Sequence, residues 1–293
     1  MEIKKELLEL LIKEIKNKSQ IKTLEDSYIS IKLNKFFQTN GDIKNKINIE
    51  FSIKKEKIIK SKEFKHILKN IREEIGKVYG CFLTNEFKKK EKILKKIIYR
   101  DEFNKLLKLH KSTRERLEYY PEIYSKIFSW FKETNTKIEK ITIADIGCGL
   151  NPLSQIYIPK EIKIKNYFCY DLNPSDMEFL NSCFNKFKLN SFANNSDLIT
   201  LNILKEINFQ KADLVFIFKV IDSLEKIKRN ISKNLLKKIK SKNIVISFPN
   251  KSLVSKEEFK IKRTWIKKFF EEMNWKFEEF KIENELFFLI NKD

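Results

Sequence analysis

Glycine, histidine and paired cysteines are scarce in this sequence of 293 residues. It contains five glycines, two histidines and four cysteines. The histidines, His66 and His110, stand far apart, and no two cysteines form a Cys-x-x-Cys pair. Because structural zinc sites are built from such pairs, we expect no metal site. Isolated cysteines are typical of reduced thiols and therefore indicate a cytoplasmic protein.

Long apolar runs are also missing. None approaches the ~18 residues that a membrane-spanning helix needs, which predicts a soluble, unsecreted protein with no membrane partner. The composition is nevertheless 42% hydrophobic and 13% aromatic, enough to form a core and too apolar for a disordered chain. The length exceeds the ~100–200 residues of a typical domain, so we expect one large domain or a large and a small one.

Negative charge is in deficit, because 61 Lys and Arg face 40 Asp and Glu. The net charge of +21 favours a polyanionic partner such as nucleic acid. Residues 51–100 hold 16 basic and 6 acidic side chains, whereas residues 1–50 hold 10 and 8. Over half of the net charge therefore lies in the first hundred residues. A general compositional bias toward Lys, Ile, Asn and Phe is the alternative explanation for the excess of positive charge.

The hydrophobic pattern divides the chain. Over residues 1–110, Leu, Ile and Phe recur at spacings of three and four among charged residues, which predicts amphipathic helices. From residue 140 onward, short apolar runs over 141–145, 166–171, 213–218 and 243–248 predict buried parallel strands with helical crossovers. Two final runs, 275–281 and 285–290, predict an antiparallel hairpin. We therefore expect a helical domain over 1–110 and an α/β, doubly wound domain over 111–293.

Two of the five glycines, Gly147 and Gly149, follow the first predicted strand in the stretch Asp-Ile-Gly-Cys-Gly. At this turn a nucleotide-like ligand approaches the backbone, and glycine allows both positive φ and close contact. The second strand ends in Asp171, which can accept the hydroxyl groups of a ribose. Pro152 stands where a dinucleotide fingerprint has its third glycine, so a methyltransferase is favoured over a dehydrogenase.

Five motifs, in order along nearly the whole chain, resemble the aminoglycoside-resistance 16S ribosomal RNA methyltransferases (Arm/Rmt-like), which methylate N7 of a decoding-site guanine. They are Tyr-Gly-Cys-Phe-Leu (79–83), His-Lys-Ser-Thr-Arg-Glu-Arg-Leu (110–117), Gly-Leu-Asn-Pro-Leu (149–153), Lys-Val-Ile-Asp-Ser-Leu-Glu (219–225) and Ser-Phe-Pro-Asn-Lys-Ser-Leu (247–253). The resemblance implies a Rossmann-like class I methyltransferase domain that uses S-adenosylmethionine, preceded by a helical domain that docks on the 30S subunit.

The resemblance also implies site residues. Arg116 takes the family position that pairs with the carboxylate of the cofactor, where a guanidinium fork can form two parallel hydrogen bonds. The other implied cofactor residues are Asp145, Gly147, Gly149, Asn151, Asp171, Leu172, Asn202, Ile203, Lys219 and Leu224. Candidates for the pocket of the target base are Phe248, Lys251 and Ser252, although a strand-ending phenylalanine is more often a core residue. No general base is expected.

Two departures from the family pattern bear on the target. Asn202-Ile203-Leu204 replaces an acidic turn that faces the adenine, and residues 254–263 contain no glycine where the family has a glycine-rich basic loop. Methylation at adenine N1 therefore stays open beside methylation at guanine N7. The sequence also leaves open a non-catalytic ribosome-binding protein with the same fold, and a small-molecule methyltransferase, which the basic amino half disfavours.

Basic residues of the first hundred are the candidates for contact with 16S ribosomal RNA, because lysines that pair with phosphates position a protein without reading sequence. They are Lys54, Lys55, Lys88, Lys89, Lys90, Lys95 and Lys96, with Lys251 near the target side. For any single lysine, an ordinary solvated helix face is the competing interpretation. We expect a monomer.

Overall fold

The computed structural model describes residues 2–18, 21–79, 82–136, 138–196, 211–227, 229–250 and 263–293. It divides into two compact units, residues 1–81 and 82–293. The division falls earlier than the boundary expected after residue 110. The reason is that residues 82–110 pack on the second unit, as in the contact of Phe103 with Phe187 and the hydrogen bond from Lys186 to the carbonyl of Leu94.

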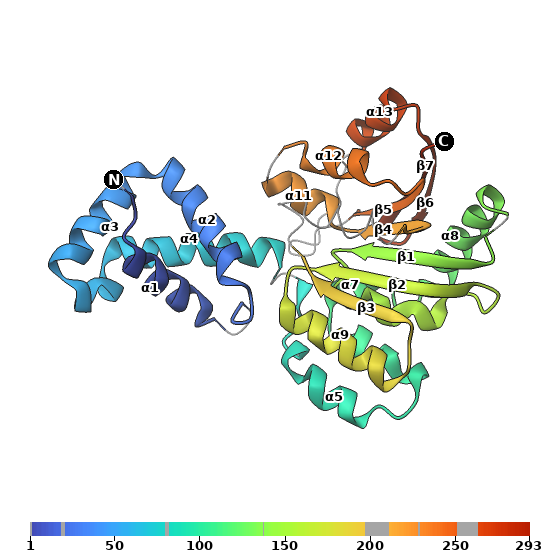
Figure 1. Cartoon of the computed structure of the whole chain (residues 1–293), viewed down its shortest axis with the longest axis horizontal. Coiled ribbons are helices and arrows are strands. Elements are labelled where there is room, and N and C mark those ends of the chain that lie inside the picture. Colours follow the sequence, from blue (N-terminus) through green and yellow to red (C-terminus); the bar gives the residue numbers. More distant parts are fainter. Residues whose placement is uncertain are drawn as a thin grey trace. The chain divides into compact units, whose positions relative to one another are not determined.

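The first unit is helical. Its elements are α1 (Lys5–Lys16), α2 (Asp26–Thr39), α3 (Gly41–Ile53), the 3-10 helix η1 (Lys55–Lys60) and α4 (Lys62–Val78) (Figure 1). The helices form because apolar residues recur on one side of each, and Leu7, Leu11 and Ile15 of α1 are completely buried. Ser61 caps α4 by accepting a hydrogen bond from the amide of Phe64. The predicted break near residue 40 separates α2 from α3.

The second unit opens with short helices and one long one. These are η3 (Phe87–Lys89), α5 (Lys90–Lys96), η4 (Arg100–Phe103), α6 (Asn104–Leu107), α7 (Lys111–Arg116) and α8 (Tyr120–Thr134). α8 buries Tyr120, Tyr124 and Phe128 on one face, and the ring of Tyr124 stacks on Phe216 of the sheet. α8 therefore covers the face of the sheet to which Phe216 points.

A seven-stranded sheet follows, with the order β3-β2-β1-β4-β5-β7-β6. The strands are β1 (Lys140–Ile146), β2 (Lys163–Asp171), β3 (Ser191–Asn195), β4 (Leu214–Phe218), β5 (Asn243–Pro249), β6 (Lys276–Ile282) and β7 (Glu285–Asn291). The first five are parallel, and β7 pairs antiparallel with both β5 and β6. The α/β prediction and its closing hairpin are confirmed. β3 was not predicted, because Ser-Phe-Ala-Asn-Asn is short and mostly polar.

Helices cover both faces of this sheet (Figure 1). The connections contain η5 (Asn151–Tyr157), α9 (Pro174–Lys186), α11 (Ile221–Ile227), α12 (Ile231–Lys238) and α13 (Thr264–Glu272). Side chains alternate along a strand, so Val215 and Ile217 join the core beneath α11, α12 and α13, while Phe216 faces α8. Both faces of β4 are thereby buried. Because β1 pairs parallel with both β2 and β4, the carboxyl ends of the three strands lie at one edge of the sheet.

Candidate functional site

The loop after β1 contains two glycines that adopt positive φ, +66° at Gly147 and +50° at Gly149. A Cβ atom on Gly147 would lie 2.4 Å from Cγ2 of Val220, and one on Gly149 would lie 3.0 Å from Nε2 of His110. No larger residue fits without displacement of a neighbour. The positive φ predicted for this turn is confirmed, and the close neighbours of the two glycines are the side chains of Val220 and His110.

Asp171 ties the end of β2 to this loop. Its Oδ2 accepts a hydrogen bond from the amide of Gly149 at 2.7 Å, and its Oδ1 accepts one from the amide of Leu172 at 2.6 Å. Each carboxylate oxygen has a further lone pair, so Asp171 can still accept two hydroxyl groups. Burial raises the pKa of Asp171 to about 6, although the two amides act in the opposite direction.

Asp145, near the end of β1, has one satisfied and one unsatisfied oxygen. Its Oδ2 accepts hydrogen bonds from Nδ2 of Asn151 at 2.8 Å and from the hydroxyl of Tyr167 at 3.0 Å. Its Oδ1 is buried and has no hydrogen-bond partner among the described residues. Burial raises the pKa of Asp145 to about 6. A buried acceptor without a hydrogen-bond partner destabilises the folded protein, so we expect a ligand to donate a hydrogen bond to Oδ1.

A charged cluster, defined here as Arg116, Lys219, Glu285 and Glu115, lies beside this loop. Arg116 donates to Glu285 through Nε, 2.9 Å from Oε2, and through Nη2, 2.8 Å from Oε1. The ammonium of Lys219 lies 3.2 Å from Glu285 and 2.7 Å from Glu115. Arg116, Lys219 and Glu285 are buried, and only the side chain of Glu115 is substantially exposed.

Electrostatics within the charged cluster favour the ionised forms of Glu285 and Arg116. Burial disfavours the charge on Glu285, but the charges of Arg116 and Lys219 outweigh it and hold the pKa of Glu285 below its ordinary value. Burial similarly opposes the charge of Arg116, yet Glu285 raises the pKa of Arg116. Lys219 follows the last residue of β4 with φ of +60°, a strained conformation that β-strand ends at functional sites often adopt.

The motif over residues 110–117 brings these parts together. His110 packs on Gly149, and its Nδ1 lies 2.9 Å from the hydroxyl of Ser112. Burial, with the nearby charges of Arg116 and Lys219, lowers the pKa of His110 to about 3, so the ring is neutral. The motif thus places the neutral ring of His110 against the glycine loop and contributes Glu115 and Arg116 to the charged cluster.

Sequence reasoning missed Glu285. A single acid ahead of the apolar run Leu-Phe-Phe-Leu-Ile resembles an ordinary strand boundary. Its role depends on the register of β7 against β5, which sets Glu285 opposite Pro249 and within reach of Arg116.

The remaining predicted residues lie as follows. Leu172 is partly buried next to Asp171, and Leu224 belongs to the core beneath α11. Phe248 is completely buried, and the guanidinium of Arg263 lies 4.4 Å from its ring centre. This burial favours a core role for Phe248 over contact with a base. The predicted residues outside the described part are Asn202, Ile203, Lys251 and Ser252.

Most of the predicted RNA-binding lysines are exposed, but Lys90 is not. Its ammonium pairs with Asp176 in the interior, and it lies 4.8 Å from the ring centre of Phe87. A buried, paired ammonium does not reach a phosphate, so the prediction for Lys90 is wrong. The others are Lys54, Lys55, Lys88, Lys89, Lys95 and Lys96, of which Lys55 pairs with Glu6 and Lys89 with Glu86.

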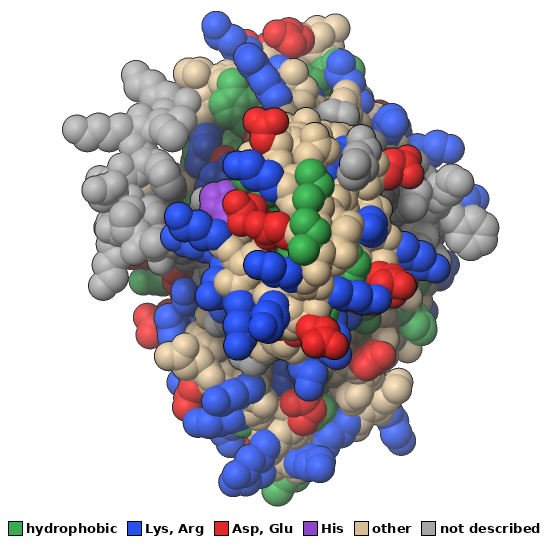
Figure 2. Space-filling view, turned by 90° about the vertical axis from the view of Figure 1, so that its left-hand side faces the viewer, with side chains coloured by type: hydrophobic (Ala, Val, Ile, Leu, Met, Phe, Trp, Pro, Cys, Tyr) green, Lys and Arg blue, Asp and Glu red, His purple; other side chains and the backbone are tan. Residues whose placement is uncertain are grey.

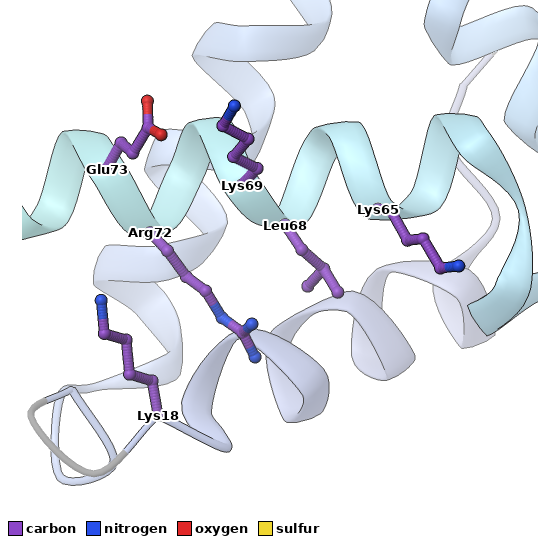
Figure 3. Close-up of a pocket in the computed structure, with 6 residues that line it drawn as sticks. All are labelled: Lys18, Lys65, Leu68, Lys69, Arg72 and Glu73. Carbon is purple, nitrogen blue, oxygen red and sulfur yellow. The ribbon is translucent and has the colours of Figure 1, made fainter.

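A basic pocket lies within the helical unit (Figure 3). It is lined by Lys18, Lys65, Leu68, Lys69, Arg72 and Glu73. Arg72 contacts the carboxyl end of α1, where its Nε donates to the carbonyl of Ile15 at 3.3 Å. The three lysines are exposed around a single acid. On the face drawn in Figure 2, Lys and Arg side chains are widespread, with acidic side chains between them.

The sheet order, the glycine loop after β1 and the acid at the end of β2 define a Rossmann-like class I methyltransferase domain. No helix in the described ranges is both long enough and apolar enough to cross a bilayer. The chain belongs to the ribosomal RNA methyltransferase (FmrO) family, whose model matches residues 62–290.

Two curated relatives are 16S rRNA (guanine(1405)-N(7))-methyltransferases. The one from Proteus mirabilis is 26% identical over 259 residues, covering 78% of this chain and 85% of the relative. The one from Frankia casuarinae is 26% identical over 193 residues, covering 64% of this chain and 63% of the relative, slightly less than two thirds of its length. The structure of the 16S rRNA methyltransferase RmtF with S-adenosyl-L-homocysteine has a TM-score of 0.67 at 18% identity, covering 99% of this chain and all of that one.

Proposed function

We propose that this protein transfers a methyl group from S-adenosylmethionine to N7 of a guanine in 16S ribosomal RNA, within the 30S subunit. One observation carries the proposal. The unsatisfied Oδ1 of Asp145 and the guanidinium of Arg116 lie on either side of Asn151, beside a glycine loop at the end of β1. A buried anion and a buried cation so placed match the ammonium and carboxylate of an amino acid.

The other residues of the site fit the same cofactor. Asp171 retains lone pairs for ribose hydroxyls, and the positive φ of the two glycines allows the tight turn that brings the amide of Gly149 to this acid. S-adenosylmethionine, when bound, supplies the methyl group from its sulfonium, and the thioether S-adenosylhomocysteine is the leaving group. The residues of this chain then bind the two ends of the molecule and fix its direction. Orientation of this kind is worth up to ~7–11 kcal/mol.

Methyl transfer to guanine N7 needs little acid–base catalysis from the protein. The nitrogen has a free lone pair at neutral pH and loses no proton on methylation. His110 is held neutral by burial, and its packing against Gly149 gives it a structural role. The main cost is extrusion of the base from its stack, a few kcal/mol. The proposal therefore requires no general base from the site.

Docking on the ribosomal subunit is supported by the helical unit. Lys18, Lys65 and Lys69 line an open pocket of this unit, and Lys54 and Lys55 are exposed on the same unit. Phosphate contacts provide affinity and register without reading sequence. We propose that the enzyme acts as a monomer, and a ribosomal substrate supports a cytoplasmic location.

The test is incubation of the protein with radiolabelled S-adenosylmethionine and purified 30S subunits, followed by mapping of the labelled nucleotide. We expect label at N7 of one guanine, and much less with Asp171→Ala, which removes the ribose acceptor. Label at N1 of an adenine would replace guanine with adenine as the target. Cofactor binding without any transfer to 30S would contradict the enzymatic function and favour a ribosome-binding protein.

A further inference from the structure

Glu285, the first residue of β7, is the centre of the charged cluster although it lies 169 residues after Arg116. Its side chain is 6% exposed. Its carboxylate receives two parallel hydrogen bonds from Arg116, the hydroxyl of Ser247 and the nearby ammonium of Lys219. A buried acid with this many donors is fixed in position, and it fixes its partners in turn.

The contact with Glu285 uses one edge of the Arg116 guanidinium. Nε and Nη2 point to the carboxylate, whereas the hydrogen bond from Nη1 to Oδ1 of Asn151 is long, at 3.4 Å. Asn151 in turn donates to Asp145 at 2.8 Å. A guanidinium has five N–H groups in a rigid fork, so the outer edge, formed by Nη1 and Nη2, retains donors for a second carboxylate. Through Nη1 this edge contacts Asn151, which lies two residues after Gly149.

The charges of the cluster are consistent with a second anion. Arg116 and Lys219 bring two buried positive charges, and Glu285 brings one buried negative charge. Glu115 adds a further negative charge, but 42% of its side chain is exposed, and solvent screens it. The buried groups of the charged cluster therefore carry one excess positive charge, and the buried carboxylate of Asp145, on the other side of Asn151, carries the opposite charge. A ligand with a carboxylate and an ammonium matches this pair.

We propose that Glu285 is a positioning residue that holds the inner edge of Arg116 so that its outer edge meets the carboxylate of the cofactor. The inference rests on the proposed function, and it adds to it a determinant of ligand selectivity. Because Glu285 acts through Arg116, it strengthens the binding only of ligands that carry the amino-acid carboxylate. It does not compete with the ligand, because the two carboxylates use different edges of one guanidinium.

The experiment compares two ligands in wild-type protein and in Glu285→Gln by calorimetry. S-adenosylhomocysteine carries the amino-acid end, and 5′-methylthioadenosine has the same nucleoside and a thioether without it. We expect Glu285→Gln to weaken the binding of S-adenosylhomocysteine by about tenfold or more, since charge-assisted hydrogen bonds hold Arg116 in place. The affinity for 5′-methylthioadenosine should change less than about twofold, so the ratio of the two affinities falls.

Two further variants make the result interpretable. Glu279→Gln removes an exposed carboxylate of the same hairpin, paired with Lys267, and should leave both affinities unchanged. Glu285→Asp keeps the carboxylate but shortens the side chain by one methylene, so it should reduce selectivity less than Glu285→Gln. It replaces Glu285→Gln in the experiment if that variant does not fold. Thermal unfolding verifies folding of each variant.

The possible outcomes separate this inference from the proposed function. Equal weakening of both ligands, or no change in their ratio, would overturn the positioning role while the cofactor assignment stands. Tighter binding of S-adenosylhomocysteine to Glu285→Gln would show that Glu285 competes with the ligand carboxylate for Arg116. That result would also overturn the positioning role. A wild-type protein that binds neither ligand would reject the proposed function, and the role of Glu285 with it.

Discussion

At the scale of single residues, Arg116 matters because two carboxylates can share its guanidinium. Its inner edge is held by Glu285, and its aromatic neighbour Phe218 lies 5.0 Å away, so the side chain has little freedom to move. Asp145 is the complementary residue, with one oxygen unsatisfied. Both features depend on the direction of donors and acceptors as well as on net charge.

Arg116→Lys is expected to lower methyl transfer to 30S subunits by about tenfold or more, although the charge is kept. A lysine ammonium is a point charge and cannot present two parallel pairs of N–H groups to two acids. The matched control is Arg114→Lys, two residues away on the exposed side of α7, which should stay within about twofold of wild type. A larger loss in Arg114→Lys would mean that the wrong arginine was selected.

At the scale of elements, the loop after β1 is compressed between two neighbours. Val220 lies at the start of α11 and His110 at the start of α7, and each occupies the space of a missing Cβ. The amides of Gly147 and Cys148 also donate to the carbonyl of Tyr170, at 2.8 and 3.1 Å. The loop conformation is therefore determined by three separate segments of the chain.

Gly147→Ala should reduce the free energy of unfolding by about 1–3 kcal/mol and weaken cofactor binding, because the added Cβ would strain both φ and the contact with Val220. Gly76→Ala is the matched control. Gly76 lies inside α4 with no atom within 4 Å of an added Cβ, so this change should stabilise the protein by about 0.5–1 kcal/mol. Urea denaturation measures both. Similar effects of the two substitutions would contradict the account of the loop.

At the scale of the whole molecule, the basic pocket and the glycine loop lie in different units, although residues 82–293 carry +14 of the net charge of +21. The helical unit holds the basic pocket of Lys18, Lys65 and Lys69, and the second unit holds the glycine loop and the charged cluster. This separation predicts that docking and cofactor binding can be changed independently.

The triple substitution of Lys18, Lys65 and Lys69 by Glu should raise the KM for 30S subunits by about tenfold or more and leave the affinity for S-adenosylhomocysteine unchanged. Phosphate binding releases counterions, so the difference from wild type should shrink as salt increases. Lys160, Lys163 and Lys165 give a control of equal charge change, since they are exposed near the amino end of β2, away from the site. Equal defects in the two triple variants would reject a specific docking role.

The sequence by itself determined the elements that depend on local patterns. Helical periodicity identified the amphipathic helices of the first unit, apolar runs identified most of the strands, and two clustered glycines identified the loop after β1. These features are readable because burial repeats with the period of the element, and because positive φ at a tight turn restricts the residue type.

Only the tertiary structure decided which charged residues meet. Lys90 resembles its exposed neighbours in sequence, yet it pairs with Asp176, 86 residues away, and leaves the set of RNA-binding candidates. Glu285 resembles a strand boundary, yet the antiparallel pairing of β7 with β5 brings it to Arg116. The energy of a buried charge depends on its partners, which come from distant segments. Sequence spacing therefore located the site, and packing determined its electrostatics.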